Sequence, residues 1–148
     1  MKQHNYKHYC SILVMIVVAL LMVYSSSNGL NNKLHFIILL TSAGISFLMH
    51  WLFFIPSFVF KTEKYYDITG TISYLTILFF IYFFMGLHLD FNFRSFIVGL
   101  LIIIWALRLG LFLFSRINID GRDRRFSKIK KSFSHFLMAF SMSGLWVF

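Results

Sequence analysis

Cysteine and acidic residues are scarce in this chain of 148 residues. The single cysteine, Cys10, excludes an internal disulfide and any metal site built from several thiolates. His4 and His8 lie one helical turn apart, but two imidazoles on a tail make a weak metal site, so we predict no metal. Five acidic residues face 14 lysines and arginines, which gives a formal net charge of +9.

Several motifs of soluble enzymes are also missing, among them a glycine-rich phosphate loop, HExxH and GxSxG. The chain is instead 59% hydrophobic and 20% aromatic, with a mean hydropathy of +0.76. Soluble chains contain about 45–50% apolar residues, so this composition indicates a membrane protein. The basic residues flank the apolar runs. We therefore interpret them as topology determinants and contacts to anionic lipid headgroups, and expect no nucleic-acid partner.

Five apolar runs approach the length of about 20 residues that a helix needs to cross a bilayer. The runs are continuous rather than alternating, which favours helices over a β-barrel. The second run is long enough to tilt, or to break at Pro56, the only proline. We predict an all-α fold, a polytopic transmembrane helix bundle forming a single domain over residues 1–148. The predicted spans are 9–24, 34–60, 68–89, 93–114 and 133–148.

The distribution of lysine and arginine predicts the orientation of these spans. The N-terminal tail has two, the connection 25–33 one, 61–67 two, the region of the next turn one, and 115–132 seven. The positive-inside rule then places the N-terminus, 61–67 and the basic loop 115–132 in the cytoplasm. The first run resembles a signal sequence, but no convincing small-x-small cleavage site follows it, so we predict a retained anchor.

Arg108 lies inside the fourth apolar run, where a charge costs about 2.5–3.5 kcal/mol even on lenient insertion scales. Eight residues of helix rise about 12 Å, so Arg108 lies one layer deeper than Arg116. One interpretation is an anion-facing guanidinium at the floor of a cavity, where Gly110 permits close backbone approach. The alternatives are a snorkelling side chain, or an ion pair with Glu63 or Asp67.

The basic loop offers a second group of candidates. Asp123 stands among Arg122, Arg124 and Arg125. A carboxylate there can orient one guanidinium by a bidentate pair and leave the others for a phosphate. The alternative is a solvated polybasic loop that only sets topology.

The connection 61–67 carries an acid and phenols near the membrane surface. Asp67 is placed to cap the N-terminus of the third span. Tyr65 and Tyr66 also suit an ordinary aromatic belt, and Glu63 supplies a carboxyl. His50, within the second span, is more typical of an interhelical hydrogen-bond partner than of a ligand.

Two blocks of sequence resemble a known family. The first is Ile55-Pro-Ser-Phe-Val-Phe-Lys-Thr-Glu-Lys-Tyr-Tyr-Asp-Ile-Thr-Gly70. The second is Trp105-Ala-Leu-Arg-Leu-Gly-Leu-Phe-Leu-Phe-Ser-Arg-Ile117, which continues through Gly121-Arg-Asp-Arg-Arg-Phe126, and a weaker third is Gly144-Leu-Trp-Val147. Together they resemble the bacterial and algal branch of the steroid 5-alpha-reductase-like membrane proteins, a domain of unknown function.

This resemblance implies a bundle of six to seven transmembrane helices, of which about five are present. Relatives are NADPH-dependent reductases of a carbon–carbon double bond, either conjugated to a carbonyl or in a sterol. The implied substrate is therefore lipid-like or steroid-like, and the implied cofactor is NADPH. The implied cofactor-binding residues are Arg108, Arg116, Asp123 and Arg125. The residues implied to line the substrate cavity or to supply a proton are Glu63, Tyr66 and Asp67.

Two features depart from the family pattern. Ser143 stands where the family leads us to expect glutamine. The chain also stops at Phe148, before the half that carries an Arg-His-Pro-Asn-Tyr-like motif in relatives. We therefore expect the N-terminal part of such a reductase, inactive without its second half or a partner subunit. The alternatives are a non-catalytic membrane subunit or remnant, and a fragment similar to the isoprenylcysteine methyltransferases.

Overall fold

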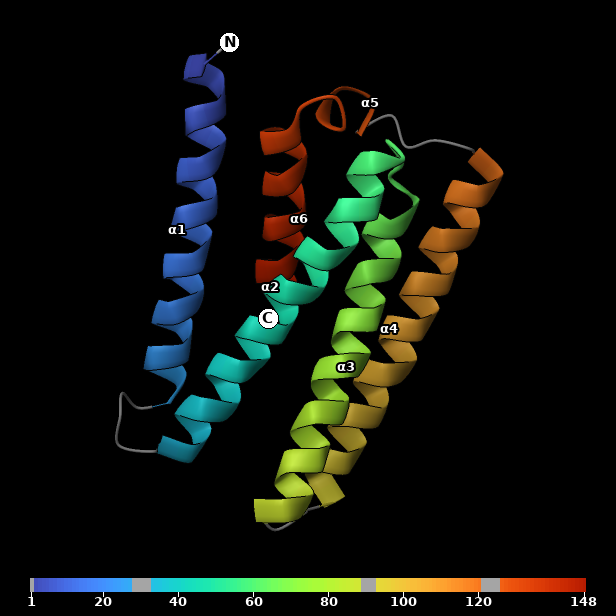
Figure 1. Cartoon of the computed structure of the whole chain (residues 1–148). Helices are drawn as coiled ribbons and strands as arrows, with labels where there is room; N and C mark the ends of the chain where they lie inside the picture. Colours follow the sequence, from blue (N-terminus) through green and yellow to red (C-terminus); the bar gives the residue numbers. More distant parts are fainter. Residues whose placement is uncertain (1, 28–32, 89–92, 121–125) are drawn as a thin grey trace.

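The computed structural model describes residues 2–27, 33–88, 93–120 and 126–148, and every element within these ranges is helical. The predicted all-α fold is confirmed (Figure 1). The elements are α1 (Lys2–Ser26), α2 (Lys33–Val59), α3 (Lys64–His88), α4 (Phe93–Asp120), α5 (Phe126–Ile129) and α6 (Phe133–Val147).

Four of these helices are long and apolar enough to cross a membrane, namely α1 to α4. The last predicted span forms α6, which is apolar but has only 15 residues and is shorter than a typical span. Helix α4 continues to Asp120, six residues past the predicted boundary at Phe114. Ile117 is buried, so α4 still packs against the bundle within the segment 115–132, which we predicted to be a loop because it is polar.

The chain runs back and forth between two ends of the bundle (Figure 1). The start of α1, the junction of α2 with α3, and α5 lie at one end. The end of α1 and the start of α2 lie at the opposite end, together with the end of α3 and the start of α4. The three segments predicted to share one side of the membrane therefore do share one end. Their cytoplasmic placement stays a prediction.

Helix α2 does not break at Pro56, which lies inside its last turn. The helix runs on to Val59, and the Phe60 N–H still donates to the Pro56 carbonyl at 2.9 Å. Proline lacks only its own N–H and remains compatible with the turn that follows it.

A left-handed residue ends α2 instead. Lys61 has a φ of 50°, and its N–H donates to the Phe58 carbonyl at 3.3 Å. The Thr62 N–H donates to the Ser57 carbonyl at 3.0 Å. These two bonds are the pattern of a Schellman motif, with lysine at the position that usually holds glycine. The motif turns the chain sharply into α3.

The core at this end is a cluster of phenylalanines. Phe54, Phe126, Phe136 and Phe140 are all at most 6% exposed. The Phe54 ring centroid lies 5.7 Å from those of Phe136 and Phe140, with edge-to-face geometry. Such pairs contribute about 0.5–1.5 kcal/mol beyond area burial. The cluster joins α2, α5 and α6.

Polar side chains connect α2 to α6 deeper in the bundle. His50 is fully buried, and its Nε2 lies 3.1 Å from the Ser143 hydroxyl. The Trp51 indole N–H donates to the Ser141 hydroxyl at 3.0 Å. The prediction that His50 makes an interhelical hydrogen bond is confirmed. In a low-dielectric environment these contacts fix the register of the two helices.

Glycines allow α3 and α4 to approach closely. A methyl group at Gly110 would overlap the Thr71 hydroxyl and lie 2.8 Å from the Thr71 Cβ. A methyl group at Gly99 would overlap the Tyr82 ring. The two glycines are 11 residues apart, about three helical turns, so both face α3. The close approach at Gly110 is thus an approach of α3, and the predicted approach of an anion beside Arg108 stays a prediction.

Candidate ligand cavity between α3, α4 and α6

A cavity of about 190 Å³ lies between α3, α4 and α6. Helical periodicity explains its lining, because residues three or four apart share one face of each helix. The lining residues of α3 lie on one face of its first three turns. Those of α4 and α6 lie on the faces directed toward α3. The lining residues are Tyr66, Asp67, Gly70, Thr71, Tyr74, Trp105, Ala106, Leu109, Leu113, Ser143, Trp146 and Val147.

Tyr66 and Asp67 are the predicted substrate-site residues that the structure brings together in this cavity. The Tyr66 hydroxyl donates to the Ala139 carbonyl at 3.3 Å. Its ring centroid lies 4.7 Å from that of Phe126 and 5.1 Å from that of Phe140. The phenol is therefore held rigidly at the boundary between the aromatic core and the cavity.

The prediction that Asp67 caps the third span is wrong. Helix α3 begins at Lys64, so Asp67 lies in its first turn. At the start of the helix the Thr62 hydroxyl accepts a hydrogen bond from the Lys64 N–H at 3.3 Å. The helix starts earlier than expected because the Schellman turn leaves Thr62 where it can bond this N–H. A carboxylate in the first turn is still favoured by the helix dipole.

Aromatic rings form the other walls of the cavity. The ring centroids of Tyr74 and Trp105 lie 5.3 Å apart in an edge-to-face arrangement. Trp146 is 82% exposed and borders the cavity from α6. The flat aromatic walls suit an apolar or unsaturated chain.

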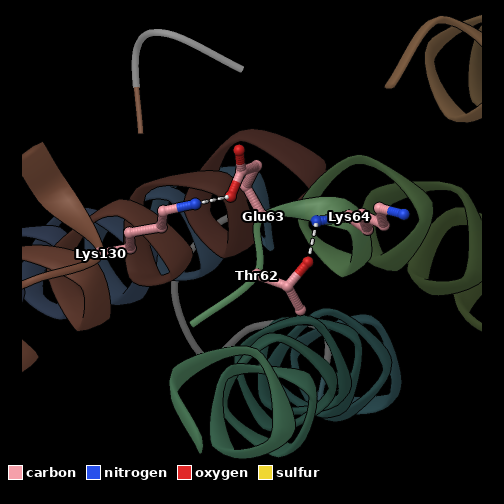
Figure 2. A network of polar contacts seen from close by, with 4 residues as sticks. All are labelled: Thr62, Glu63, Lys64 and Lys130. Carbon is pink, nitrogen blue, oxygen red and sulfur yellow. Dashed lines mark hydrogen bonds and ion pairs between the residues drawn. The ribbon is translucent and has the colours of Figure 1, made fainter. Parts of the chain in front are cut away.

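Glu63 lies outside the cavity lining and binds Lys130. Its carboxylate Oε2 lies 2.5 Å from the Lys130 Nζ, and its side chain is 4% exposed (Figure 2). The pair joins the α2–α3 turn to the segment between α5 and α6, which is a contact that stabilises the fold. The role predicted for Glu63 as a proton donor stays a prediction.

Arg108 and Arg116, the two predicted phosphate-binding residues that the structure describes, do not line the cavity. Arg108 lies on an exposed face of α4 and has no hydrogen-bond or ion-pair partner among the residues the structure describes. The alternative ion pair with Glu63 or Asp67 is not found there. Arg116 is partly buried near the end of α4. Asp123 and Arg125 lie outside the described residues.

Most of the cavity lining is not apparent from the sequence. Thr71 and Tyr74 continue the face of α3 that begins at Asp67, so helical spacing from that residue could have found them. Trp105 has the residue type of a packing or lipid-facing side chain. Ser143 stands out only as a departure from a family pattern, and its contact with His50 depends on the packing of α2 against α6.

The long apolar helices define this chain as a multi-pass helical membrane protein. It belongs to the family described as protein of unknown function (DUF1295), whose model matches residues 53–148. The matched region contains every residue that lines the cavity. No curated protein and no solved structure matches the chain.

Proposed function

We propose that this chain forms the substrate end of a membrane-embedded, NADPH-dependent reductase of a carbon–carbon double bond in a lipid-like substrate. The observation that carries the proposal is the cavity itself, which joins Tyr66 and Asp67 to aromatic and apolar walls within the bundle. The resemblance of the blocks around these residues to steroid 5-alpha-reductase-like proteins supports the type of reaction.

The residues of the cavity have distinct parts in this proposal. The apolar and aromatic walls bind the hydrocarbon and exclude water, which strengthens polar contacts inside. Tyr66 and Asp67 place a phenol and a carboxyl beside the bound group, where they can orient it or hold a proton. Ligand pockets usually measure about 300–1,000 Å³, so this cavity suits one end of a lipid rather than a whole molecule.

The cavity is too small for a dinucleotide, so the cofactor's phosphates belong elsewhere. Guanidinium groups are the preferred partners of phosphate, and Arg108 and Arg116 present two of them on α4. In this proposal they bind the phosphates together with the predicted residues Asp123 and Arg125. Bound NADPH supplies the hydride, and the lipid gains the hydride on one carbon and a proton on the other.

The test is reduction of an unsaturated long-chain lipid by the protein in nanodiscs, reconstituted together with the second half or partner subunit that the resemblance implies. The product is analysed by mass spectrometry after reaction with NADPH deuterated at the transferred position. The proposal predicts one deuterium and one solvent hydrogen in the product. Gly70→Leu fills the cavity, since Gly70 lines it and a Cβ there is 3.9 Å from Val147 Cγ2. This variant is expected to lose at least about 90% of the rate, because ligand and side chain compete for one volume.

Gly44→Leu is the matched control. Gly44 is exposed on α2 and lies outside this cavity, and a Cβ added to it would meet no other atom within 4 Å. This variant is expected to keep the wild-type rate. Absence of any reduced lipid in this reconstituted assay with the wild-type protein would favour the non-catalytic membrane subunit instead. Equal rates in the two leucine variants would show that reduction occurs at another place.

A further inference from the structure

A groove of about 400 Å³ lies between α3 and α4 and shares no residue with the cavity between α3, α4 and α6. It lies toward the end of the bundle where α3 ends and α4 begins, opposite the end that carries α5 (Figure 1). Its size falls within the range of about 300–1,000 Å³ that is usual for ligand pockets. The proposed reductase site does not account for this groove.

The contact between Tyr82 and Gly99 shapes the groove, which both residues line. A methyl group at Gly99 would overlap the Tyr82 ring, so this ring lies directly against the backbone of α4. The Tyr82 hydroxyl also donates to the Ser95 carbonyl at 2.7 Å. The two contacts fix α3 against α4 along the groove, so the groove is preformed by the packing of the helices.

The groove has a charge at one end and apolar walls along its length. Arg94, Val98 and Ile102 form one row of α4, and Leu78 and Ile81 line the side that belongs to α3. Eight residues of helix rise about 12 Å, so the row extends that far from the guanidinium into the apolar span. Arg94 stands in the first turn of α4, is exposed, and has no hydrogen-bond or ion-pair partner among the residues the structure describes.

We infer that this groove binds one membrane phospholipid, with the lipid phosphate at Arg94 and an acyl chain along Val98 and Ile102. Guanidinium groups are preferred partners of phosphate. In a bilayer the phosphates lie at the surface and the acyl chains extend inward, which is the order of charged and apolar groups in the groove. A free phosphate would gain only one exposed, screened charge and nothing from the apolar walls. The ligand is therefore a lipid rather than a dissolved anion.

The test is competition between lipids that share their acyl chains and differ in the headgroup. The full chain in phosphatidylcholine nanodiscs is photolabelled with a trace of phosphatidylglycerol that carries a diazirine on one acyl chain. Labelled residues of α3 and α4 are quantified by mass spectrometry. Unlabelled phosphatidylglycerol is expected to compete about fivefold more strongly than diacylglycerol at the same mole fraction, the effect usual for one basic residue at a lipid surface.

Two charge variants separate a bound phosphate from a general attraction of anionic lipid. Arg94→Gln is expected to remove the preference for phosphatidylglycerol over diacylglycerol. Lys33→Gln is the matched control, because Lys33 is exposed at the start of α2, lies at the same end of the bundle and does not line the groove. It is expected to keep the preference. Equal losses in the two variants would show an unspecific surface charge and overturn the inference.

Two tryptophan variants test the acyl chain. Val98→Trp places a large side chain in the groove and is expected to lower labelling there severalfold, because side chain and lipid compete for one volume. Leu101→Trp is the control, since Leu101 is exposed on α4 and does not line the groove. It is expected to label as the wild type does, and equal labelling of the two variants would overturn the inference.

The remaining outcomes are equally decisive. Absence of saturable labelling in the groove, or equal competition by phosphatidylglycerol and diacylglycerol, overturns the inference. Displacement of the labelled lipid by inorganic phosphate alone would show a simple anion site and also overturns it. These results do not bear on the reduction of a lipid in the other cavity, so the proposed function stands or falls separately.

Discussion

The Glu63 carboxylate is buried and lies against the ammonium group of Lys130, whose side chain is 26% exposed. A pair of this kind contributes more than an exposed salt bridge, because water screens it less. It contributes less than a fully buried pair, because the lysine keeps part of its hydration. The contact joins segments 67 residues apart in the chain, so it stabilises the tertiary arrangement rather than one helix.

Lys130→Met is expected to lower the free energy of unfolding by about 2 kcal/mol, since it removes the ammonium group that lies against a buried carboxylate. Lys131→Met removes an exposed neighbouring lysine and is expected to change the free energy of unfolding by less than about 0.5 kcal/mol. The measurement is reversible unfolding in mixed micelles. The double variant Glu63→Gln/Lys130→Met is expected to recover part of the loss, and strictly additive losses would contradict a direct ion pair.

Lys61 offers a test of backbone strain, since it is a non-glycine residue at φ 50°. Lys61→Gly is expected to raise the free energy of unfolding by about 0.5–1 kcal/mol, because glycine adopts this conformation without a Cβ penalty. Lys61→Val is expected to lower it, because a β-branched side chain is more strained there. Reversible unfolding in mixed micelles measures both changes. A loss in Lys61→Gly would show that the lysine side chain, not the turn, matters.

At the level of elements, Gly110 determines how closely α4 lies against α3. Gly110→Ala is expected to cost about 1–3 kcal/mol, because a methyl group there collides with Thr71. Removal of the Thr71 hydroxyl and methyl by Thr71→Ala is expected to relieve part of this cost. Thermal unfolding of the single and double variants in detergent measures both effects.

Gly44→Ala is the control for this comparison, because Gly44 lies in a helix with open space around it. It is expected to leave stability unchanged or to raise it slightly, since alanine favours the helix by up to about 1 kcal/mol. Equal effects at Gly44 and Gly110 would contradict close packing of α3 against α4.

The helices themselves were predictable because apolar runs and flanking charges are local features of the sequence. The residues at which the helices begin and end were less predictable. The end of α2 depends on a backbone conformation at Lys61 that no residue type announces, since lysine rarely occupies this position. The extension of α4 past Phe114 depends on burial of Ile117, which is a tertiary contact. Asp67 has the residue type of a cap, but the Thr62 hydroxyl accepts the hydrogen bond at the helix start.

The site was partly predictable because some of its residues are neighbours in the sequence. Tyr66 and Asp67 stand on one turn of α3, so a single sequence block contained both. Ser143 and Trp105 reach the cavity only through the packing of α6 and α4, which the sequence of one helix does not specify. The sequence shows that Glu63 carries a carboxyl that could hold a proton. It does not show the ion pair with Lys130, because that lysine lies 67 residues away in the chain.

At the scale of the whole molecule, the start of α1, the α2–α3 junction and α5 share one end of the bundle (Figure 1). The positive-inside rule predicts that this end faces the cytoplasm. In a Cys10→Ser background, Lys7→Cys and Lys131→Cys are therefore expected to resist a membrane-impermeant maleimide in intact cells, whereas Arg94→Cys reacts. Reaction at Lys131→Cys with protection at Arg94→Cys would show the inverted orientation.

Occupancy of the cavity by a lipid is the central claim, and a cysteine at its polar wall measures it directly. The variant carries Ser143→Cys in the Cys10→Ser background, so it has one thiol. Maleimide labelling is followed in nanodiscs with and without an excess of an unsaturated long-chain alcohol or ketone, and Gly44→Cys is the control. We expect the lipid to slow labelling at residue 143 severalfold and to leave residue 44 unchanged. Equal labelling rates at residue 143 with and without either lipid would contradict the account.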